Sequence, residues 1–231
     1  MKFLNGLLSL FYPTECASCG RYIKDFQYGY VCPSCYNSIR PIGKNYCKIC
    51  GISLPSKHVD TCIVCRVNKR HFDYARSAGA YEGALRALIH SLKFHQKTKA
   101  GRVIARYFIN NADVDLTGFI FVPVPVSRLT GTERGYNQSE VLAKELAKLS
   151  GNKVINALIK VKETQQQRFL EREDRAKNVK GAFKASCDVT GMPIALVDDV
   201  ATTCATLNEA ARVLKKAGAG KVICLTAART L

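Results

Sequence analysis

Two absences limit what kind of protein this sequence encodes. No stretch approaches the roughly eighteen consecutive apolar residues that a membrane-spanning helix requires. The N-terminal stretch MKFLNGLLSLFYPTEC has one basic residue, a broken apolar run and no small-residue cleavage site, so it does not match a secretory signal peptide. We therefore expect a protein that is neither secreted nor membrane-spanning and that works in the cytoplasm.

Acidic residues are scarce. The chain has 18 Asp and Glu against 35 Lys and Arg, which gives a formal net charge of +17. A charge of this size is typical of proteins that contact a phosphate-bearing polyanion or an anionic membrane surface. The simpler alternative is a basic protein whose charge only keeps it in solution. The hydrophobic fraction, 47%, is that of a globular protein.

Cysteine is concentrated at the N-terminal end. Eight of the eleven cysteines form four C-x2-C pairs within the first 65 residues. Twelve residues separate the first two pairs and eleven separate each later neighbour, which is the ligand spacing of two zinc ribbons in tandem. Two C-x2-C turns complete a closed tetrahedron of thiolates around one ion. We predict two structural Zn2+ sites with sequential ligands, Cys16, Cys19, Cys32 and Cys35 in the first and Cys47, Cys50, Cys62 and Cys65 in the second.

The cysteine spacing leaves alternatives open. Interleaved pairing of the four turns would use the same ligands, and one of the two sites could stay empty. A disulfide framework would need an oxidising compartment, which the lack of a signal peptide argues against. Because each ribbon is short and has little apolar core, metal binding is expected to supply most of its folding free energy.

The cysteine-rich segment divides the chain. We predict a zinc-ribbon module over residues 1–71, ending in a basic linker, and a second domain over residues 72–231, where regular apolar patterning begins. The module starts with a short apolar leader, Phe3 to Phe11, beside a basic body. Peripheral contact of this leader with the inner face of the membrane is one alternative, and packing against its own ribbon is the other.

A long helical pattern opens the second domain. It runs from residue 82 to about residue 110, with a break expected near residues 99–101. Positive charges recur at helical spacing beside its apolar stripe, at Arg86, His90, Lys93 and Lys97. Two interpretations stand: a solvated helix face, or a surface whose Arg86 and two lysines follow the phosphates of a nucleic acid.

The rest of the second domain alternates between short apolar strands and helices. Strands are predicted over residues 119–124, 153–161, 194–200 and 222–227, and helices over residues 137–149 and 206–217. Continuous apolar strands separated by helices predict a parallel sheet covered on both faces, an α/β fold. In such sheets, ligands bind at the carboxyl ends of the strands.

The stretch PIALVDDVATTCATL places candidate ligand-binding residues at one such strand end. Asp198 and Asp199 close the apolar run, and a loop of small residues then leads into a helix. The N–H groups at a helix start favour an anion, while paired carboxylates suit sugar hydroxyls or Mg2+ held through water. We predict a ribose 5-phosphate site whose loop residues are Ala201, Thr202, Thr203, Cys204, Ala205 and Thr206.

Together these motifs resemble those of the ComF family of competence proteins. The resemblance rests on the four C-x2-C pairs and on YEGALRALIHSLKF, VPVPVSRLTGTERGYNQSEVLAKELAK, TQQQRFLEREDRAKNVKGAF and VDDVATTCAT. The last stretch is similar to the phosphoribosyl pyrophosphate (PRPP) motif of type I phosphoribosyltransferases. The family implies a zinc module followed by a type I phosphoribosyltransferase-like parallel sheet flanked by helices. It also implies a role in natural transformation, the uptake and handling of incoming single-stranded DNA.

The resemblance also implies roles for individual residues. Asp198 and Asp199 would bind the ribose hydroxyls of PRPP, with Mg2+ as cofactor, and the loop after them would bind the 5-phosphate. Ser127 and Arg128 would form the pyrophosphate loop. Other polar positions match the family's signatures, and a mobile flap over the site is one role for some of them. These positions are Arg134, Asn137, Gln138, Gln167, Arg175 and Asn178.

Cys204 departs from the family pattern, which has glycine at this position of the loop. Glycine tolerates a positive φ and lets a phosphate approach the backbone, whereas cysteine adds a Cβ atom and a sulfur. We interpret Cys204 as a small-residue replacement rather than as a reactive thiol at a helix N-terminus. The replacement could weaken PRPP binding, and it argues against catalysis more than against ligand binding.

Two functions fit these residues. The one we favour is DNA handling, with single-stranded DNA and PRPP as ligands, proteins of DNA uptake or recombination as partners, and Tyr81, Phe94 or Tyr136 for stacking on bases. The alternative is an active phosphoribosyltransferase with a nucleobase-related acceptor. No residue is a convincing general base and no segment clearly forms a nucleobase pocket, so the sequence leaves catalysis open.

Overall fold

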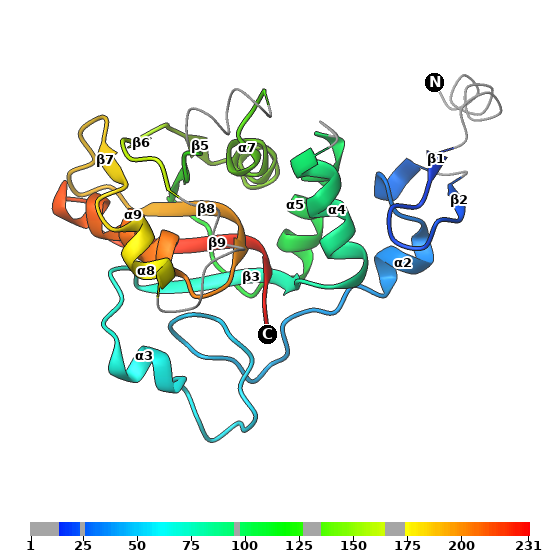
Figure 1. The fold of residues 1–231 in the computed structure, drawn as a ribbon, viewed down its shortest axis with the longest axis horizontal. Coiled ribbons are helices and arrows are strands. Elements are labelled where there is room, and N and C mark those ends of the chain that lie inside the picture. The colour runs from blue at the N-terminus through cyan, green and yellow to red at the C-terminus, as the bar shows by residue number, and fades with distance from the viewer. Residues whose placement is uncertain (1–13, 24–25, 95–97, 127–134, 165–173) are drawn as a thin grey trace.

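A five-stranded parallel sheet forms the centre of the molecule (Figure 1). The structure is a computed structural model, and it describes residues 14–23, 26–94, 98–126, 135–164 and 174–231. The strand order is β3-β9-β8-β4-β5, and every neighbouring pair is parallel. The strands are β3 (Tyr74–Ala80), β9 (Val222–Arg229), β8 (Ile194–Ala201), β4 (Ile120–Pro123) and β5 (Lys153–Val154).

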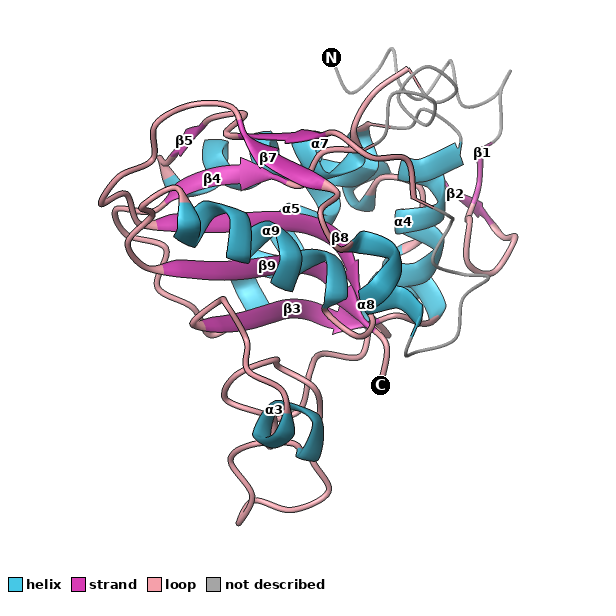
Figure 2. Ribbon diagram, turned by 60° about the vertical axis from the view of Figure 1, so that its left-hand side comes forward, coloured by secondary structure: helices cyan, strands magenta, loops and turns pink. Residues whose placement is uncertain are grey.

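Helices cover both faces of this sheet. The helices on one face are α4 (Gly83–Phe94), α5 (Lys99–Asn111) and α7 (Gln138–Ser150), and those on the other are α8 (Asp174–Val179) and α9 (Ala205–Lys216). Figure 2 shows α8 and α9 in front of the sheet and α5 and α7 behind it. All eight residues of β9 are buried between these layers, and all except Thr226 and Arg229 are apolar, as expected for a strand covered on both faces. The predicted α/β fold, a parallel sheet flanked by helices, is confirmed.

The prediction of a single strand over residues 153–161 is wrong. Only β5 joins the main sheet, and β6 (Leu158–Lys160) instead pairs antiparallel with β7 (Phe183–Ala185) in a separate two-stranded sheet. Leu158 is buried and Ile159 is exposed, an alternation that suits a ribbon with one face in solvent. The long helical pattern is divided into two helices, but not at the expected residues 99–101: α4 ends at Phe94, and residues 99–101 form the first turn of α5.

The first zinc ribbon packs against α4. It contains β1 (Thr14–Glu15), β2 (Tyr22–Ile23), the 3-10 helix η1 (Phe26–Tyr28) and α2 (Pro33–Asn37). Its buried residues Ile23 and Val31 lie in the same apolar cluster as Leu85 and Leu88 of α4. The hydroxyl of Tyr107 on α5 also donates a hydrogen bond to the carbonyl of Ile39, at 3.0 Å.

The second zinc ribbon packs at the other end of the sheet, beside β3 (Figure 2). It includes the helix α3 (Ile63–Val67), and its Ile49 carbonyl accepts a hydrogen bond from the backbone N–H of Ala75 at 2.7 Å. Gly51, with φ +70, sits so close that a Cβ atom there would lie 2.6 Å from the Ala75 carbonyl oxygen. Among the described residues, no helix is both long enough and apolar enough to cross a membrane.

Candidate phosphate and zinc sites

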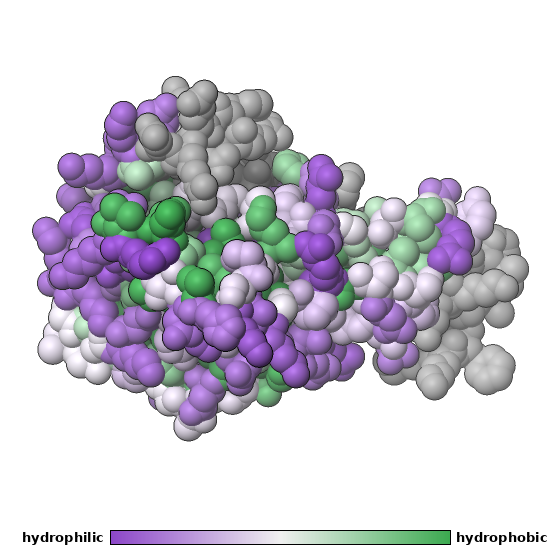
Figure 3. Space-filling view, turned by 90° about the horizontal axis from the view of Figure 1, so that it is seen from below, coloured by the Kyte–Doolittle hydropathy of each residue, from purple (hydrophilic) through white to green (hydrophobic). Residues whose placement is uncertain are grey.

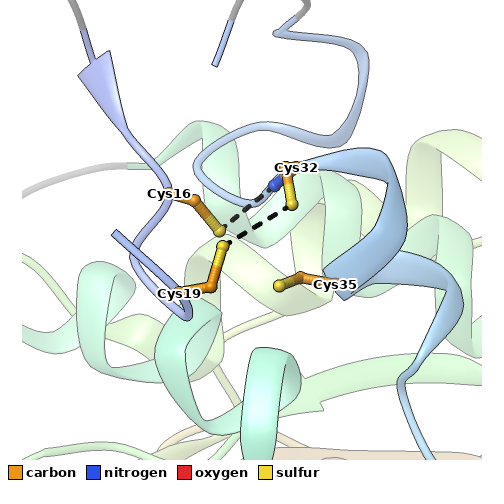
Figure 4. Close-up of side chains that lie close together, drawn as sticks. All are labelled: Cys16, Cys19, Cys32 and Cys35. Atoms are coloured by element: carbon orange, nitrogen blue, oxygen red, sulfur yellow. Dashed lines mark hydrogen bonds between the residues drawn. The ribbon is translucent and has the colours of Figure 1, made fainter. Parts of the chain in front are cut away.

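Each set of four N-terminal cysteines converges on one point. Figure 4 shows the thiols of the first set, which come from two C-x2-C turns, directed toward a common centre. Within each set the sulfur atoms lie within 4.8 Å of one another, and all are free thiols. The sets are the two predicted sequential groups, so the sequential pairing is confirmed and the interleaved pairing is wrong.

The sulfur geometry fits Zn2+. Four thiolates about 2.3 Å from a tetrahedral ion lie about 3.8 Å from one another. The sulfur atoms of Cys19 and Cys32 are 3.9 Å apart, and those of Cys50 and Cys62 are 3.7 Å apart. Backbone N–H groups point at the sulfurs as well, as in the 3.3 Å contact from Cys62 N to Cys47 Sγ. Such contacts offset thiolate charge, so the eight cysteines fit two closed structural zinc sites.

The predicted carboxylate pair lies at the carboxyl end of β8. The Asp198 side chain accepts hydrogen bonds from the hydroxyl of Ser139 on α7 and from the backbone N–H of Asp199, both at 2.9 Å. Burial, reinforced by the neighbouring Asp199 carboxylate, raises the pKa of Asp198 to about 7. Two carboxylates at one strand end are the oxygen donors that Mg2+ prefers, so the residues fit the predicted cofactor.

Lys93 joins this carboxylate pair. Its Nζ atom lies 2.6 Å from Asp199 Oδ2, and the side chains of both residues are about one-fifth exposed. Burial alone would lower the pKa of Lys93, but the Asp199 carboxylate outweighs it and the pKa is raised. The predicted basic row along α4 is therefore not uniform. Arg86 is exposed beside the first ribbon, whereas Lys93 points into the carboxylate site.

The loop after β8 turns sharply at Cys204. With φ 61, Cys204 is the one non-glycine residue with a positive φ in the described part of the chain. The N-terminal end of α9 follows directly, and the Thr203 hydroxyl accepts a hydrogen bond from the N–H of Ala205 at 3.3 Å. The first N–H groups of a helix lack partners within the helix, so this loop can present them to an anion.

A buried arginine connects this loop with the second zinc site. Arg229, only 2% exposed at the end of β9, donates to Cys204 Sγ at 2.7 Å and to Cys50 Sγ at 3.5 Å. Burial raises the pKa of the Cys204 thiol, although Arg229 acts in the opposite direction. Cys204 is thus a buried hydrogen-bond partner of Arg229, in line with the prediction that it is not a reactive thiol.

Other predicted site residues have different positions. The Asn137 side chain accepts from the N–H of Ser139 and donates to the Val124 carbonyl, both at 3.0 Å, so it caps α7 beside the end of β4. Gln138 is buried at the start of α7. That Asn137 and Gln138 belong to a mobile flap stays a prediction. Asn178 lies on α8, which packs against α9.

Several predicted residues lie outside the described part of the chain. These are the apolar leader from Phe3 to Phe11, Lys97, Ser127, Arg128, Arg134 and Gln167, and also the side chain of Arg175. The predictions for them stay predictions.

Sequence reasoning missed two residues that shape the site. Ser139 falls inside the RGYNQSE stretch, so its motif carried a signal, but no role was assigned to it. Arg229 carries none, because a single arginine near the end of a chain has no distinguishing spacing. Only the pairing of β9 with β8, which places Arg229 opposite Ala201, brings it to the loop.

Comparison with known proteins agrees with this architecture. A family model described as a double zinc ribbon domain matches residues 7–67. The chain is 31% identical over 202 residues to "Competence protein F" of Haemophilus influenzae, covering 83% of this chain and 87% of that protein. It is 29% identical over 209 residues to "DNA utilization protein YhgH" of Escherichia coli K12, covering 87% and 91%.

Among solved structures, a glutamine phosphoribosylpyrophosphate amidotransferase from Bacillus subtilis aligns with a TM-score of 0.37 and 18% identity. The alignment covers 63% of this chain and 27% of that one.

Proposed function

Because this chain belongs to the ComF family of competence proteins, we propose that it binds single-stranded DNA and that its β8 loop binds a ribose 5-phosphate such as that of PRPP. The observation that carries the phosphate site is the arrangement at one strand end. Asp198, Asp199 and Lys93 lie together, directly before a sharp turn into the N-terminal end of α9. The DNA role is supported by the net charge of +17 and by relatives named for competence and DNA utilization.

The carboxylates supply the sugar end of the proposed site. An ionised carboxylate accepts hydrogen bonds from vicinal ribose hydroxyls, which fixes the sugar relative to the strand. Lys93 now neutralises Asp199, so an incoming ribose or cation must share or replace that ion pair. When bound, Mg2+ would sit near Asp198 and Asp199 and offset the charge of the pyrophosphate.

The turn supplies the phosphate end. Backbone N–H groups around Cys204 and the start of α9 donate to phosphate oxygens without a charged side chain, and the helix dipole adds to the attraction. The buried side chain of Arg229 donates a hydrogen bond to the sulfur atom of Cys204. This contact stabilises the positive φ that Cys204 adopts in the turn. The phosphate end is thereby set before the ligand arrives, which lowers the ordering cost of binding.

The DNA-binding proposal is tested by fluorescence anisotropy with a labelled oligothymidine, using zinc-loaded protein at several salt concentrations. We expect binding that weakens steeply with salt, since each neutralised phosphate lowers the slope of log K against log salt by about 0.7 for a single strand. A duplex of equal length should compete less well per nucleotide than the single strand. No binding at low salt, or binding that ignores salt, would contradict the proposal.

A further inference from the structure

A deep groove opens beside α9, on the side of the phosphate loop away from the carboxylates. Its volume is about 690 Å3, and its walls come from α3, the segment 68–71, α8 and the first half of α9. Thr203 and Ala205 of the phosphate loop line one end, whereas Asp198, Asp199 and Lys93 do not line it. The groove therefore adjoins the proposed ribose 5-phosphate site but is a separate hollow.

Lysine and arginine side chains line this groove. Lys69 and Arg70 come from the segment after the second ribbon, Lys180 follows α8 and Arg212 lies on α9. Lys69 and Lys180 are exposed. The positive charges thus come from three chain segments that are far apart in the sequence, and the fold brings them around one hollow.

Among the described residues, Glu209 is the one acid in the lining, and it does not cancel this charge. Glu209 is only 8% exposed, and its carboxylate accepts two hydrogen bonds from Arg212, at 2.6 and 2.8 Å, and one from the backbone N–H of Gly181 at 2.8 Å. These contacts lower the pKa of Glu209, led by the hydrogen bonds from Arg212. Glu209 and Arg212 neutralise each other, so Lys69 and Lys180 are left without an acid to offset them in the described lining.

Arg70 is held beside the zinc ligands. Its guanidinium lies within hydrogen-bond reach of the sulfur atom of the zinc ligand Cys65. The Nε atom of Arg70 is buried and has no hydrogen-bond partner within the described residues. On the groove floor, the backbone N–H of His71 donates to Asn208 Oδ1 of α9 at 2.8 Å, which ties the basic segment to the helix. The backbone that carries the basic side chains of this segment is therefore attached to α9 by a hydrogen bond.

The shape of the groove narrows the choice of ligand. Its volume lies within the range of about 300 to 1,000 Å3 that is typical of small-molecule pockets, a size that suits a few linked nucleotide groups rather than a double helix. A concave hollow also does not match a membrane surface. Basic residues from separate chain segments, together with the apolar Val64 and Val179 in the same lining, suit a chain of phosphates better than one phosphate group.

We propose that this groove binds the phosphate backbone of single-stranded DNA. The inference rests on the proposed function and assigns it a location: the strand runs along α9 between Lys69 and Lys180 and passes the outer side of the phosphate loop. Figure 3 views the molecule from the side on which the second ribbon lies, where hydrophilic side chains cover much of the surface.

The test compares two double variants in the oligothymidine assay. Lys69→Gln/Lys180→Gln removes two charges from the groove at exposed positions. Lys144→Gln/Lys148→Gln removes two exposed charges from α7, on the opposite face of the sheet. We expect the slope of log K against log salt to become less negative by about 1.4 in the groove variant, two lost phosphate contacts at about 0.7 each, and to stay nearly unchanged in the α7 variant. Zinc content and PRPP binding should match the wild type in both.

Each other outcome overturns a specific statement. Equal losses of DNA affinity in the two variants, or no loss in the groove variant, would overturn the assignment of the DNA to this groove, while DNA binding by the wild type would stand. A wild type that binds no oligonucleotide would overturn the proposed function and the groove together. The last measurement uses thymidine monophosphate in place of the oligonucleotide. If it binds as tightly as the oligonucleotide and this binding is lost in the groove variant, the groove is a mononucleotide site and the strand proposal is overturned.

Discussion

Cys204 has a backbone conformation that is unusual for a residue with a side chain. A non-glycine residue in the left-handed region costs about 1 kcal/mol or more, yet the loop after β8 places one there. The sulfur atom gives the compensation, because it accepts a 2.7 Å hydrogen bond from the buried guanidinium of Arg229. A cysteine at this position thus lacks the conformational freedom of glycine but supplies a hydrogen-bond partner for the buried guanidinium of Arg229.

This exchange is tested with two substitutions. Cys204→Ala keeps the strained φ and removes a partner of Arg229, so the free energy of unfolding should fall by about 2 to 3 kcal/mol. Cys204→Gly loses the same contact but relaxes the backbone, so it should be less destabilising by about 1 kcal/mol. Urea unfolding of the zinc-loaded proteins measures both values. A glycine variant less stable than the alanine variant would contradict the explanation.

Asp198 makes stability depend on pH. Its pKa is raised to about 7 in the folded protein, whereas an aspartate in an unfolded chain has a pKa of about 3.9. Between these values the native state holds a proton that the unfolded state has lost, so the free energy of unfolding falls as the pH rises toward 7. Asp198→Asn removes this dependence. Relative to the wild type, it should gain about 2 kcal/mol in unfolding free energy between about pH 5 and pH 8.

Asp188→Asn is the matched control for this pH dependence. Hydrogen bonds from Thr190 lower the pKa of Asp188, so this exposed aspartate is ionised throughout that interval. The control variant should therefore keep the wild-type slope of unfolding free energy against pH. A wild-type slope in Asp198→Asn as well would show that Asp198 does not hold the proton.

At the level of elements, the second zinc ribbon and the phosphate loop form one packed unit. Cys47, Cys50 and Cys65 lie in the same apolar cluster as Cys204 and Leu207 of α9. The first ribbon packs instead with α4 and α5. Loss of the second metal should therefore disturb the loop, whereas loss of the first should not.

Substitution of one exposed or partly exposed ligand in each ribbon tests this difference. Cys62→Ser in the second site should weaken Mg2+–PRPP binding several-fold, because Cys50, which contacts Arg229 below the phosphate loop, then loses its metal. Cys19→Ser in the first site should leave that binding near the wild-type value. Zinc content, measured by release to a chromogenic chelator, should fall by one ion in each variant. Equal losses of PRPP binding would contradict a specific link.

The sequence predicted the elements whose patterns depend on local spacing. The strands β8 and β9 are continuous apolar runs, and the cysteine turns have fixed ligand spacing, so both could be recognised without tertiary information. The strand pair β6 and β7 could not be recognised in this way. Ile159 is apolar, so the sequence of its segment resembles a core strand, although its side chain is exposed. The pairing of Lys93 with Asp199 also depends on how α4 lies against β8, which periodicity does not give.

For the whole molecule, each zinc ribbon borders a hollow that is lined in part by basic residues. Arg86 and His90 line one of about 410 Å3 between α4 and the first ribbon, and the larger groove beside α9 carries the cations of the second ribbon's linker. Both ribbons therefore do more than fold around zinc: each forms one wall of a basic surface against the sheet domain. This arrangement suits a protein that follows a strand along its surface while it holds a sugar phosphate at the end of β8.

The most direct test of the sugar-phosphate claim is calorimetry of Mg2+–PRPP binding to the zinc-loaded protein, beside an Asp198→Asn/Asp199→Asn variant. We predict saturable binding by the wild type, at about one ligand per chain, and its loss in the variant while the variant stays folded and keeps its zinc. Absence of binding by a folded, zinc-loaded wild type would contradict the account, and so would equal binding by both proteins.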